Sequence, residues 1–142
     1  EWACQSHARN PHKVKDPYVL GAIINLGLCL NLCERSSVLL LQKSYSILKE
    51  SFEKLGYNIS SELKNENPDD GGFNLIRPLD CAVIKNLHTM MAIEGIYFDT
   101  VYGYFQEGSN AFLDSGIREK SHVQICVRNT ACIKGYFLPR EK

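Results

Sequence analysis

Residues 116–125 are the part of the chain that most suggests chemistry, because they deliver a glutamate to the start of a clear strand pattern. Glu119 stands between two cations, Arg118 and Lys120, directly before alternating strand residues. A strand fixes its backbone, so side chains at a loop–strand junction can face a cleft in a defined position. A carboxylate held there can accept a hydrogen bond from a sugar hydroxyl and stabilise nearby positive charge. The alternative is a cluster of charges that faces solvent. Taken alone, this segment favours that alternative.

Other catalytic signatures are missing. The sequence has no GxGxxG, no Walker phosphate loop, no HExxH and no GxSxG. The four histidines are scattered along the chain at His7, His12, His88 and His122. Their spacing favours no Cys–His nucleophilic pair and gives little support to a ribonuclease-like enzyme. The cysteines form no CxxC pair and no zinc spacing, which predicts no metal site: Cys4, Cys29, Cys33, Cys81, Cys126 and Cys132.

The setting of these cysteines indicates a cellular compartment. Several of them lie within apolar patterns, where cysteine behaves as a small hydrophobe, so we expect reduced thiols in an intracellular, cytoplasmic protein. No apolar run approaches the ~18 residues that span a bilayer, and no signal peptide is visible. The chain begins with Glu1 rather than methionine. We therefore expect a fragment of a longer protein.

Charge is unevenly distributed although the formal net charge is zero. Residues 50–70 contain six acids and two lysines, whereas residues 117–142 contain six bases and two acids. Two solvated faces are the simpler interpretation. The sharper hypothesis is that the basic end handles a phosphate-bearing ligand.

Five segments are typical of strands. Residues 18–26 form a continuous apolar run, which predicts a strand buried on both faces, and residues 29–32 predict a short extended piece. Residues 100–105 are a further candidate. Residues 121–128 alternate cleanly between apolar and polar positions, and residues 132–137 are predicted to be their hairpin partner. We expect the strands that begin at positions 18, 100, 121 and 132 to form one sheet.

Two segments are typical of helices. In residues 36–55 apolar side chains recur at alternating spacings of three and four, which predicts a helix ended by Gly56. Residues 79–93 predict a second helix, and residues 57–77 have loop composition. We expect three side chains of the first helix to be buried in the main core, namely Leu41, Leu48 and Phe52.

Two runs of the chain resemble ADP-ribosyltransferase-like proteins. Residues 17–32 resemble the strand, turn and leucine-x-leucine step of that superfamily, and residues 118–127 resemble its catalytic-glutamate strand. The chain from Glu1 to about Arg140 also resembles an uncharacterised bacterial family of this fold. The resemblance implies an α+β fold with mixed or antiparallel small sheets and packed helices. It also implies that residues 1–142 form a single domain, the later part of an ADP-ribosyltransferase-like domain.

The function implied by the resemblance is transfer of ADP-ribose from NAD to a protein or nucleic acid acceptor, or hydrolysis of NAD, as a bacterial effector, toxin or defence enzyme. In the histidine–tyrosine–glutamate branch, Glu119 would be the catalytic carboxylate, and the histidine and tyrosine strands would precede Glu1. Ile117 occupies the place where arginine-modifying members carry Gln or Glu, which argues against arginine transfer. No metal and no membrane are implied, and a homo-oligomer stays open.

The rival hypothesis is a non-enzymatic binding module. It would keep the fold and use the basic residues 117–142, or the loop at residues 65–72, as its recognition surface.

Overall fold

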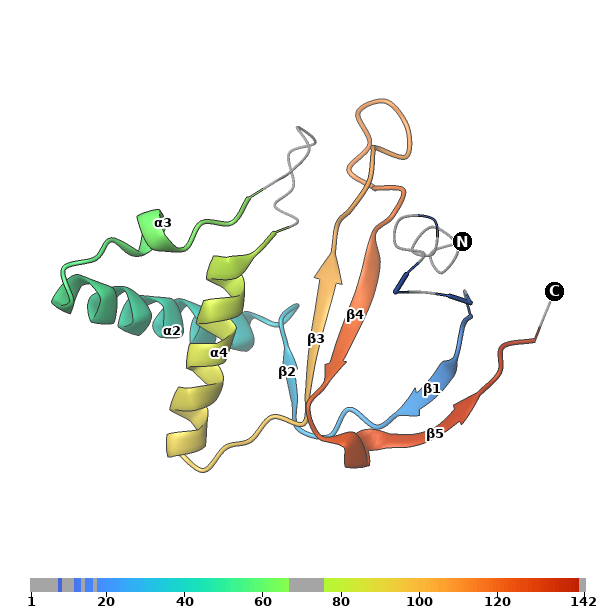
Figure 1. The fold of residues 1–142 in the computed structure, drawn as a ribbon, viewed down its shortest axis with the longest axis horizontal. Coiled ribbons are helices and arrows are strands. Elements are labelled where there is room, and N and C mark those ends of the chain that lie inside the picture. Colours follow the sequence, from blue (N-terminus) through green and yellow to red (C-terminus); the bar gives the residue numbers. More distant parts are fainter. Residues whose placement is uncertain (1–7, 9–11, 14, 17, 67–75, 141–142) are drawn as a thin grey trace. The chain divides into compact units, whose positions relative to one another are not determined.

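The computed structural model describes residues 8, 12–13, 15–16, 18–66 and 76–140. The chain divides into two compact units, residues 27–129 and residues 1–26 with 130–142. The larger unit contains β2 (Cys29–Asn31), α2 (Arg35–Lys54), α3 (Ile59–Glu62), α4 (Pro78–Ile93), β3 (Thr100–Phe105) and β4 (His122–Val127). The smaller unit contains β1 (Gly21–Ile24), the 3-10 turn η1 (Thr130–Cys132) and β5 (Ile133–Phe137) (Figure 1).

The predicted α+β class is confirmed at this level, with three α-helices and two small sheets among the described residues. The ADP-ribosyltransferase-like fold and the single domain over residues 1–142 stay predictions. Cys4, His7 and most of the predicted loop at 65–72 lie outside the described residues. No helix in the described part of the chain has the length and apolar character needed to cross a bilayer.

The larger unit is built around a three-stranded sheet of order β2-β3-β4. β2 runs parallel to β3, and β3 pairs with β4 in antiparallel fashion from Thr100 opposite Val127 to Phe105 opposite His122. The strands predicted at residues 29–32, 100–105 and 121–128 are therefore confirmed. β2 is followed by α2 and α4 before the chain returns to β3, as a parallel pair requires a long crossover.

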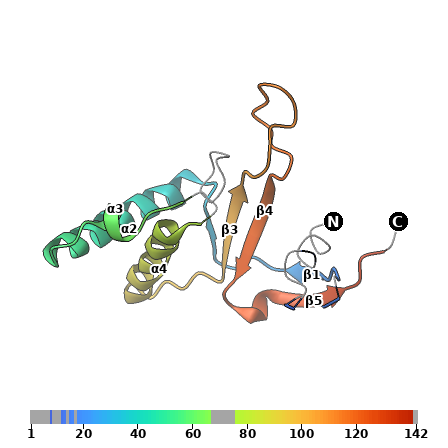
Figure 2. The same cartoon turned by 45° about the horizontal axis from the view of Figure 1, so that its top comes forward.

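α2 confirms the helix predicted for residues 36–55, and Gly56 ends it with a positive φ of 79°. The expectation of a deeply buried apolar stripe holds only in part, because Leu41, Leu48 and Phe52 are half-buried. The buried positions on α2 are Ser37, which is 6% exposed, and Ser44, which is 0% exposed. α2 and α4 pack against each other (Figure 2), and Ser44 lies in this contact.

Ser44 carries the polar part of this helix contact. Its hydroxyl donates to the carbonyl of Val83 at 2.8 Å, and the Asn86 side-chain amide donates to both the Ser44 carbonyl and hydroxyl at 3.0 Å. A buried hydroxyl needs such partners, since losing them costs its full desolvation. Ser44 therefore fixes the register of α2 on α4.

α4 confirms the second predicted helix and carries the centre of the core. Leu87 and Met91, in its second half, pack with Leu30 of β2. Val101 of β3 and Leu41 of α2 lie against this cluster. The core therefore joins the C-terminal half of α4 to the start of β3.

The predicted loop at residues 57–77 contains a short helix, α3, that sequence composition did not indicate. Asn58 caps it, since its side-chain oxygen accepts from the Ser60 amide at 2.9 Å. Ile59 is only 1% exposed and anchors the turn. The Asn58 cap and the buried Ile59 together stabilise this turn within a polar segment.

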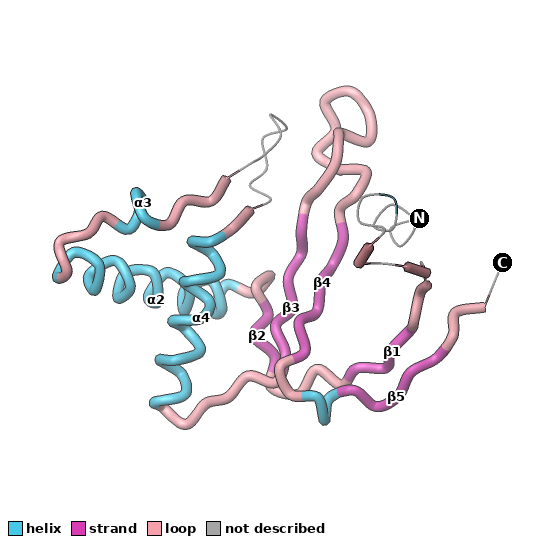
Figure 3. The backbone as a smooth tube through the Cα atoms, in the orientation of Figure 1, coloured by secondary structure: helices cyan, strands magenta, loops and turns pink. Residues whose placement is uncertain are grey.

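The smaller unit departs from two predictions. β5 pairs with β1, from Gly21 opposite Phe137, and does not form the predicted hairpin with β4. The strands therefore form two sheets rather than the one that was predicted. The turn η1 follows β4 in the chain and leads into β5 (Figure 3). The Asn25 amide donates to the Cys132 carbonyl at 2.9 Å.

The expectation that residues 18–26 are buried on both faces is also wrong. Tyr18 is 70% exposed and Ile23 is 60% exposed. Tyr136 on the paired strand is 63% exposed. β1 and β5 form a two-stranded ribbon whose side chains are half-buried or exposed, unlike those of a strand that is buried on both faces.

Candidate functional site

Glu119 lies in the long hairpin connection between β3 and β4, in a turn shortly before β4 begins. The backbone there is held, because the Lys120 amide donates to the Glu107 carbonyl and the Glu119 amide to the Ser109 carbonyl, both at 3.0 Å. An isolated bridge between Asn110 and Arg118 extends the pairing further. The predicted loop–strand junction is therefore confirmed, and it is an ordered extension of the hairpin.

The Glu119 side chain is exposed, and the described residues offer its carboxylate no hydrogen bond or ion pair. Its neighbour Arg118 turns back into the hairpin, where Nη1 donates to the Gly108 carbonyl at 3.3 Å. The carboxylate is thus presented on a fixed backbone and remains available to a polar ligand.

A fixed polar pair follows Glu119 on β4. His122 Nδ1 lies 2.8 Å from the Lys120 carbonyl, and His122 Nε2 lies 2.7 Å from the Gln124 amide nitrogen. A carbonyl can only accept, so the ring proton belongs on Nδ1 and Nε2 accepts from Gln124. The imidazole also stacks on Phe105, with ring centroids 6.1 Å apart. Sequence alternation placed His122 and Gln124 on one face, but did not predict this pairing.

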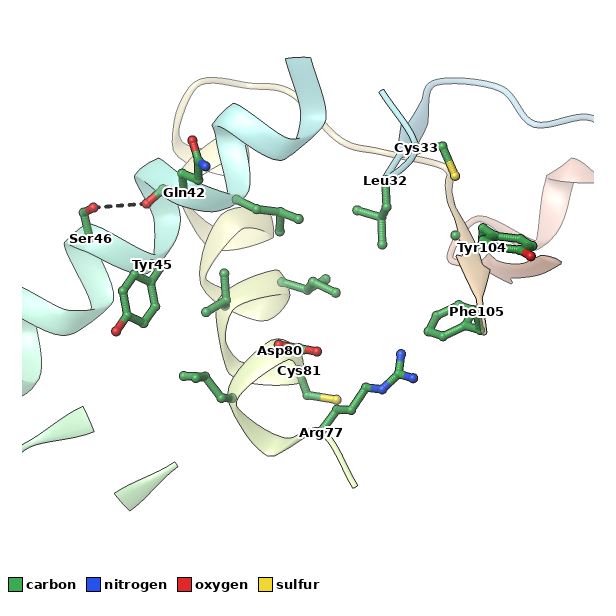
Figure 4. A pocket seen from close by; sticks show the side chains of 15 residues that line it. Leu32, Cys33, Gln42, Tyr45, Ser46, Arg77, Asp80, Cys81, Tyr104 and Phe105 are labelled. Carbon is green, nitrogen blue, oxygen red and sulfur yellow. Dashed lines mark hydrogen bonds between the residues drawn. The ribbon is translucent and has the colours of Figure 1, made fainter. Parts of the chain in front are cut away.

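A cavity of about 760 Å³ opens in the larger unit between α2, α4 and the end of β3 (Figure 4). The second half of α4 packs into the core, whereas its first half, with Val83 and Ile84, forms a wall of the cavity. Leu41 and Tyr45 of α2 form another wall, and Phe105 closes the β3 side. The cavity is thus a wedge between helices and sheet.

Two charged residues line this cavity, and both stand at the start of α4. The Arg77 guanidinium lies over the Phe105 ring, 4.8 Å from its centroid. Asp80 accepts from the Asn65 amide at 2.7 Å, while the Asn65 side-chain oxygen accepts from the Leu79 and Asp80 amides at 3.1 and 3.3 Å. Asn65 therefore caps α4 from a distance, and Asp80 is committed to that cap.

Glu119 does not line this cavity, so the predicted site residue and the cavity are separate features. Phe105 connects them, because it lines the cavity and stacks on His122, three residues after Glu119. No sequence spacing pointed to Arg77 or Phe105, since the elements that bring them together are distant in the chain.

The basic end of the chain is partly used by local structure. Arg128 Nη1 donates to the Phe98 carbonyl at 2.9 Å, and Lys134 Nζ donates to the Ala131 carbonyl at 2.8 Å. Arg118 is held in the same way by Gly108. Each of these cations keeps its charge and further donors, so the hypothesis of a phosphate-binding basic end stays a prediction.

The remaining titratable groups suggest structural roles. His88 packs edge-on against Phe98, and its Nδ1 is buried without a hydrogen-bond partner. Burial lowers the pKa of His88, and the charge of Arg128 lowers it further.

The described cysteines are unpaired, and no group of three His, Cys, Asp or Glu side chains among the described residues is arranged to hold a metal.

The sequence matched no protein-family model, no curated protein and no solved structure.

Proposed function

We propose that this chain belongs to an ADP-ribosyltransferase-like enzyme that uses NAD, with Glu119 as the catalytic carboxylate. The observation that best supports this proposal is the hairpin, which presents an unpartnered carboxylate on a backbone held at Glu119 and Lys120. The resemblance of residues 17–32 and 118–127 supports it independently. The mixed α+β fold with small sheets is compatible with it.

In this proposal Glu119 accepts a hydrogen bond from the 2′-hydroxyl of the nicotinamide-side ribose. The bond between ribose C1′ and the nicotinamide nitrogen breaks, and neutral nicotinamide leaves with the electron pair. The carboxylate stabilises the positive charge that develops on the ribose. A nucleophile of the acceptor, or water, then bonds to C1′ and loses its proton. Other groups are needed around the same ribose, since such catalysis depends on positioning.

A non-enzymatic binding module is the second candidate. The observation that favours it is the separation of Glu119 from the cavity, which leaves the carboxylate exposed on the hairpin. A module of this kind would bind a partner without breaking a bond in NAD.

NAD titration into the isotope-labelled chain, followed by amide chemical shifts, separates the two candidates. The enzyme proposal predicts shifts that are centred on the hairpin at Glu119 and on His122, and that are smaller in Glu119→Gln. Glu107→Gln is the matched control, because Glu107 lies in the same hairpin and contributes its backbone carbonyl to the fold. Absence of hairpin shifts at millimolar NAD would favour the binding module.

A further inference from the structure

The ribbon of β1 and β5 gathers exposed apolar side chains at one of its ends. Gly21 pairs with Phe137, so the start of β1 and the end of β5 lie at the same end of the ribbon (Figure 1). Leu20, just before β1, is 57% exposed, and Leu138, just after β5, is 62% exposed. Their neighbours in the two segments are exposed as well, namely Tyr18, Val19, Tyr136 and Phe137. Scattered exposed apolar side chains are common, but a cluster of them indicates a binding surface.

The pairing of the two strands holds this end of the ribbon together. The Phe137 ring lies against Gly21, where an added side chain would collide with it. An aromatic ring that covers a glycine of the paired strand stabilises such a pair. Phe137 therefore serves the ribbon itself, while Leu20 and Leu138 beside it remain exposed to solvent. We call residues 18–20 and 136–138 the ribbon end.

The smaller unit is cationic, whereas the larger unit is anionic. Residues 1–26 and 130–142 contain six lysines and arginines and three acids, and residues 27–129 contain ten and thirteen. Lys15 precedes the ribbon end in the chain and Arg140 follows it, and both side chains are exposed. Cations thus flank the apolar cluster on both sides in the sequence. Charge complementarity therefore favours an anionic partner.

The kinds of side chain favour a lipid surface over a nucleic acid. Single-stranded nucleic acids bind through cations and through aromatic rings on which bases stack, a role that Val19, Leu20 and Leu138 cannot fill. Surfaces that lie on membranes combine aromatic and aliphatic side chains with lysines and arginines. The apolar groups enter the boundary of the acyl chains, and the cations attract anionic headgroups.

We propose that the ribbon end binds the surface of an anionic lipid membrane. Leu20 and Leu138 enter the interface, and Lys15 and Arg140 interact with the headgroups. The smaller unit then acts as a peripheral membrane anchor, whatever reaction Glu119 supports.

Co-sedimentation of the chain with lipid vesicles measures this binding. Vesicles of phosphatidylcholine with about one third phosphatidylglycerol should bind the chain roughly tenfold or more tightly than vesicles of phosphatidylcholine alone. Salt at about 1 M should weaken the binding to anionic vesicles, because it screens the cations. Hydrogen exchange should slow in residues 18–24 and 133–140 on these vesicles and keep its rate in the hairpin between β3 and β4.

The cations are tested by the double variant Lys15→Gln with Arg140→Gln. It should weaken binding to anionic vesicles roughly tenfold or more, since each cation near an anionic surface contributes to the affinity. Arg35→Gln with Lys43→Gln is the matched control, because it removes the same charges from exposed positions on α2 of the larger unit. This control should keep most of the affinity.

The apolar contact is tested by Leu20→Ser with Leu138→Ser, which should abolish vesicle binding. Leu55→Ser with Leu113→Ser is its control, because these leucines of the larger unit are even more exposed. Melting temperatures identify any variant that fails to fold, and the charge variants then carry the test. Losses confined to the ribbon-end variants support the proposal. Equal binding to both kinds of vesicle, equal losses in the controls, or tighter binding of a single-stranded oligonucleotide than of anionic vesicles would overturn it.

Discussion

Asn129 donates a 2.7 Å hydrogen bond from its side-chain amide to Oδ1 of Asp99, and this contact ties the end of β4 to the start of β3. Oδ2 of the same carboxylate accepts from the Leu28 amide at 2.9 Å, directly before β2. Both hydrogen bonds lower the pKa of Asp99 below its ordinary value of 3.8, and the one from Asn129 has the larger effect. The Asp99 carbonyl also accepts from the Arg128 and Asn129 amides. One residue therefore joins all three strands of the larger sheet.

The Asp99 junction predicts a strong effect of Gly27→Ala. Gly27 has a φ of 58°, and an added Cβ would lie 2.4 Å from Oδ2 of Asp99. The backbone strain and the displaced carboxylate should lower the free energy of unfolding by roughly 1–3 kcal/mol, measured by urea denaturation. Gly116→Ala is the control, because nothing lies within 4 Å of its added Cβ and its φ is not positive. Equal stability of the two variants would contradict the role of Gly27.

Ser44→Val should destabilise the contact between α2 and α4. Valine removes the hydroxyl that donates to Val83 and accepts from Asn86, and it adds bulk at a position with 0% exposure. We expect a loss of about 2–4 kcal/mol in the free energy of unfolding, from overpacking and unpaired polar groups. Ser51→Val introduces the same residue at an exposed site of the same helix and should cost no more than about 0.5 kcal/mol. Similar losses of unfolding free energy in Ser44→Val and Ser51→Val would show that the lower helix propensity of valine, rather than packing against α4, causes the destabilisation.

His88 predicts a pH dependence of stability. Its pKa in the folded chain is below the ordinary value of 6.5, so the unfolded chain takes up a proton first as pH falls. The stability that neutral His88 contributes is present above pH 6.5 and is lost as pH falls through the window below it. His88→Phe keeps a ring against Phe98 and removes the titration, so its melting temperature should fall less between about pH 7 and about pH 5.

His12→Phe makes the same substitution at an exposed position and is the control for the change of residue itself. If the melting temperatures of wild type and His88→Phe fell equally between about pH 7 and about pH 5, the pH dependence would not come from His88.

The periodic elements could be predicted from sequence because their patterns are local. The spacing in α2 and the alternation in β4 correctly gave a helix and a strand. Strand partners could not be predicted, since the pattern at residues 132–137 suits pairing with β1 as well as with β4. The burial of Ser44 was missed because polarity alone places serine on the surface. Arg77 and Phe105 meet only through the tertiary fold.

The candidate carboxylate was found from its position beside a strand, and the structure places Glu119 on an ordered hairpin. Its separation from the cavity could not be predicted, because the length and path of the connection between β3 and β4 decide it. The sequence carries no periodic signal there.

Nicotinamide release from NAD by the natural protein tests the catalytic role of Glu119 most directly. Glu119→Gln keeps the size and hydrogen bonding of the side chain and removes its charge. It should preserve the melting temperature and reduce the rate of release by roughly 10²-fold or more, as expected for a lost electrostatic group, while Glu107→Gln keeps the wild-type rate. Wild-type turnover in Glu119→Gln, or no nicotinamide release by the wild-type protein above the uncatalysed rate, would contradict the account.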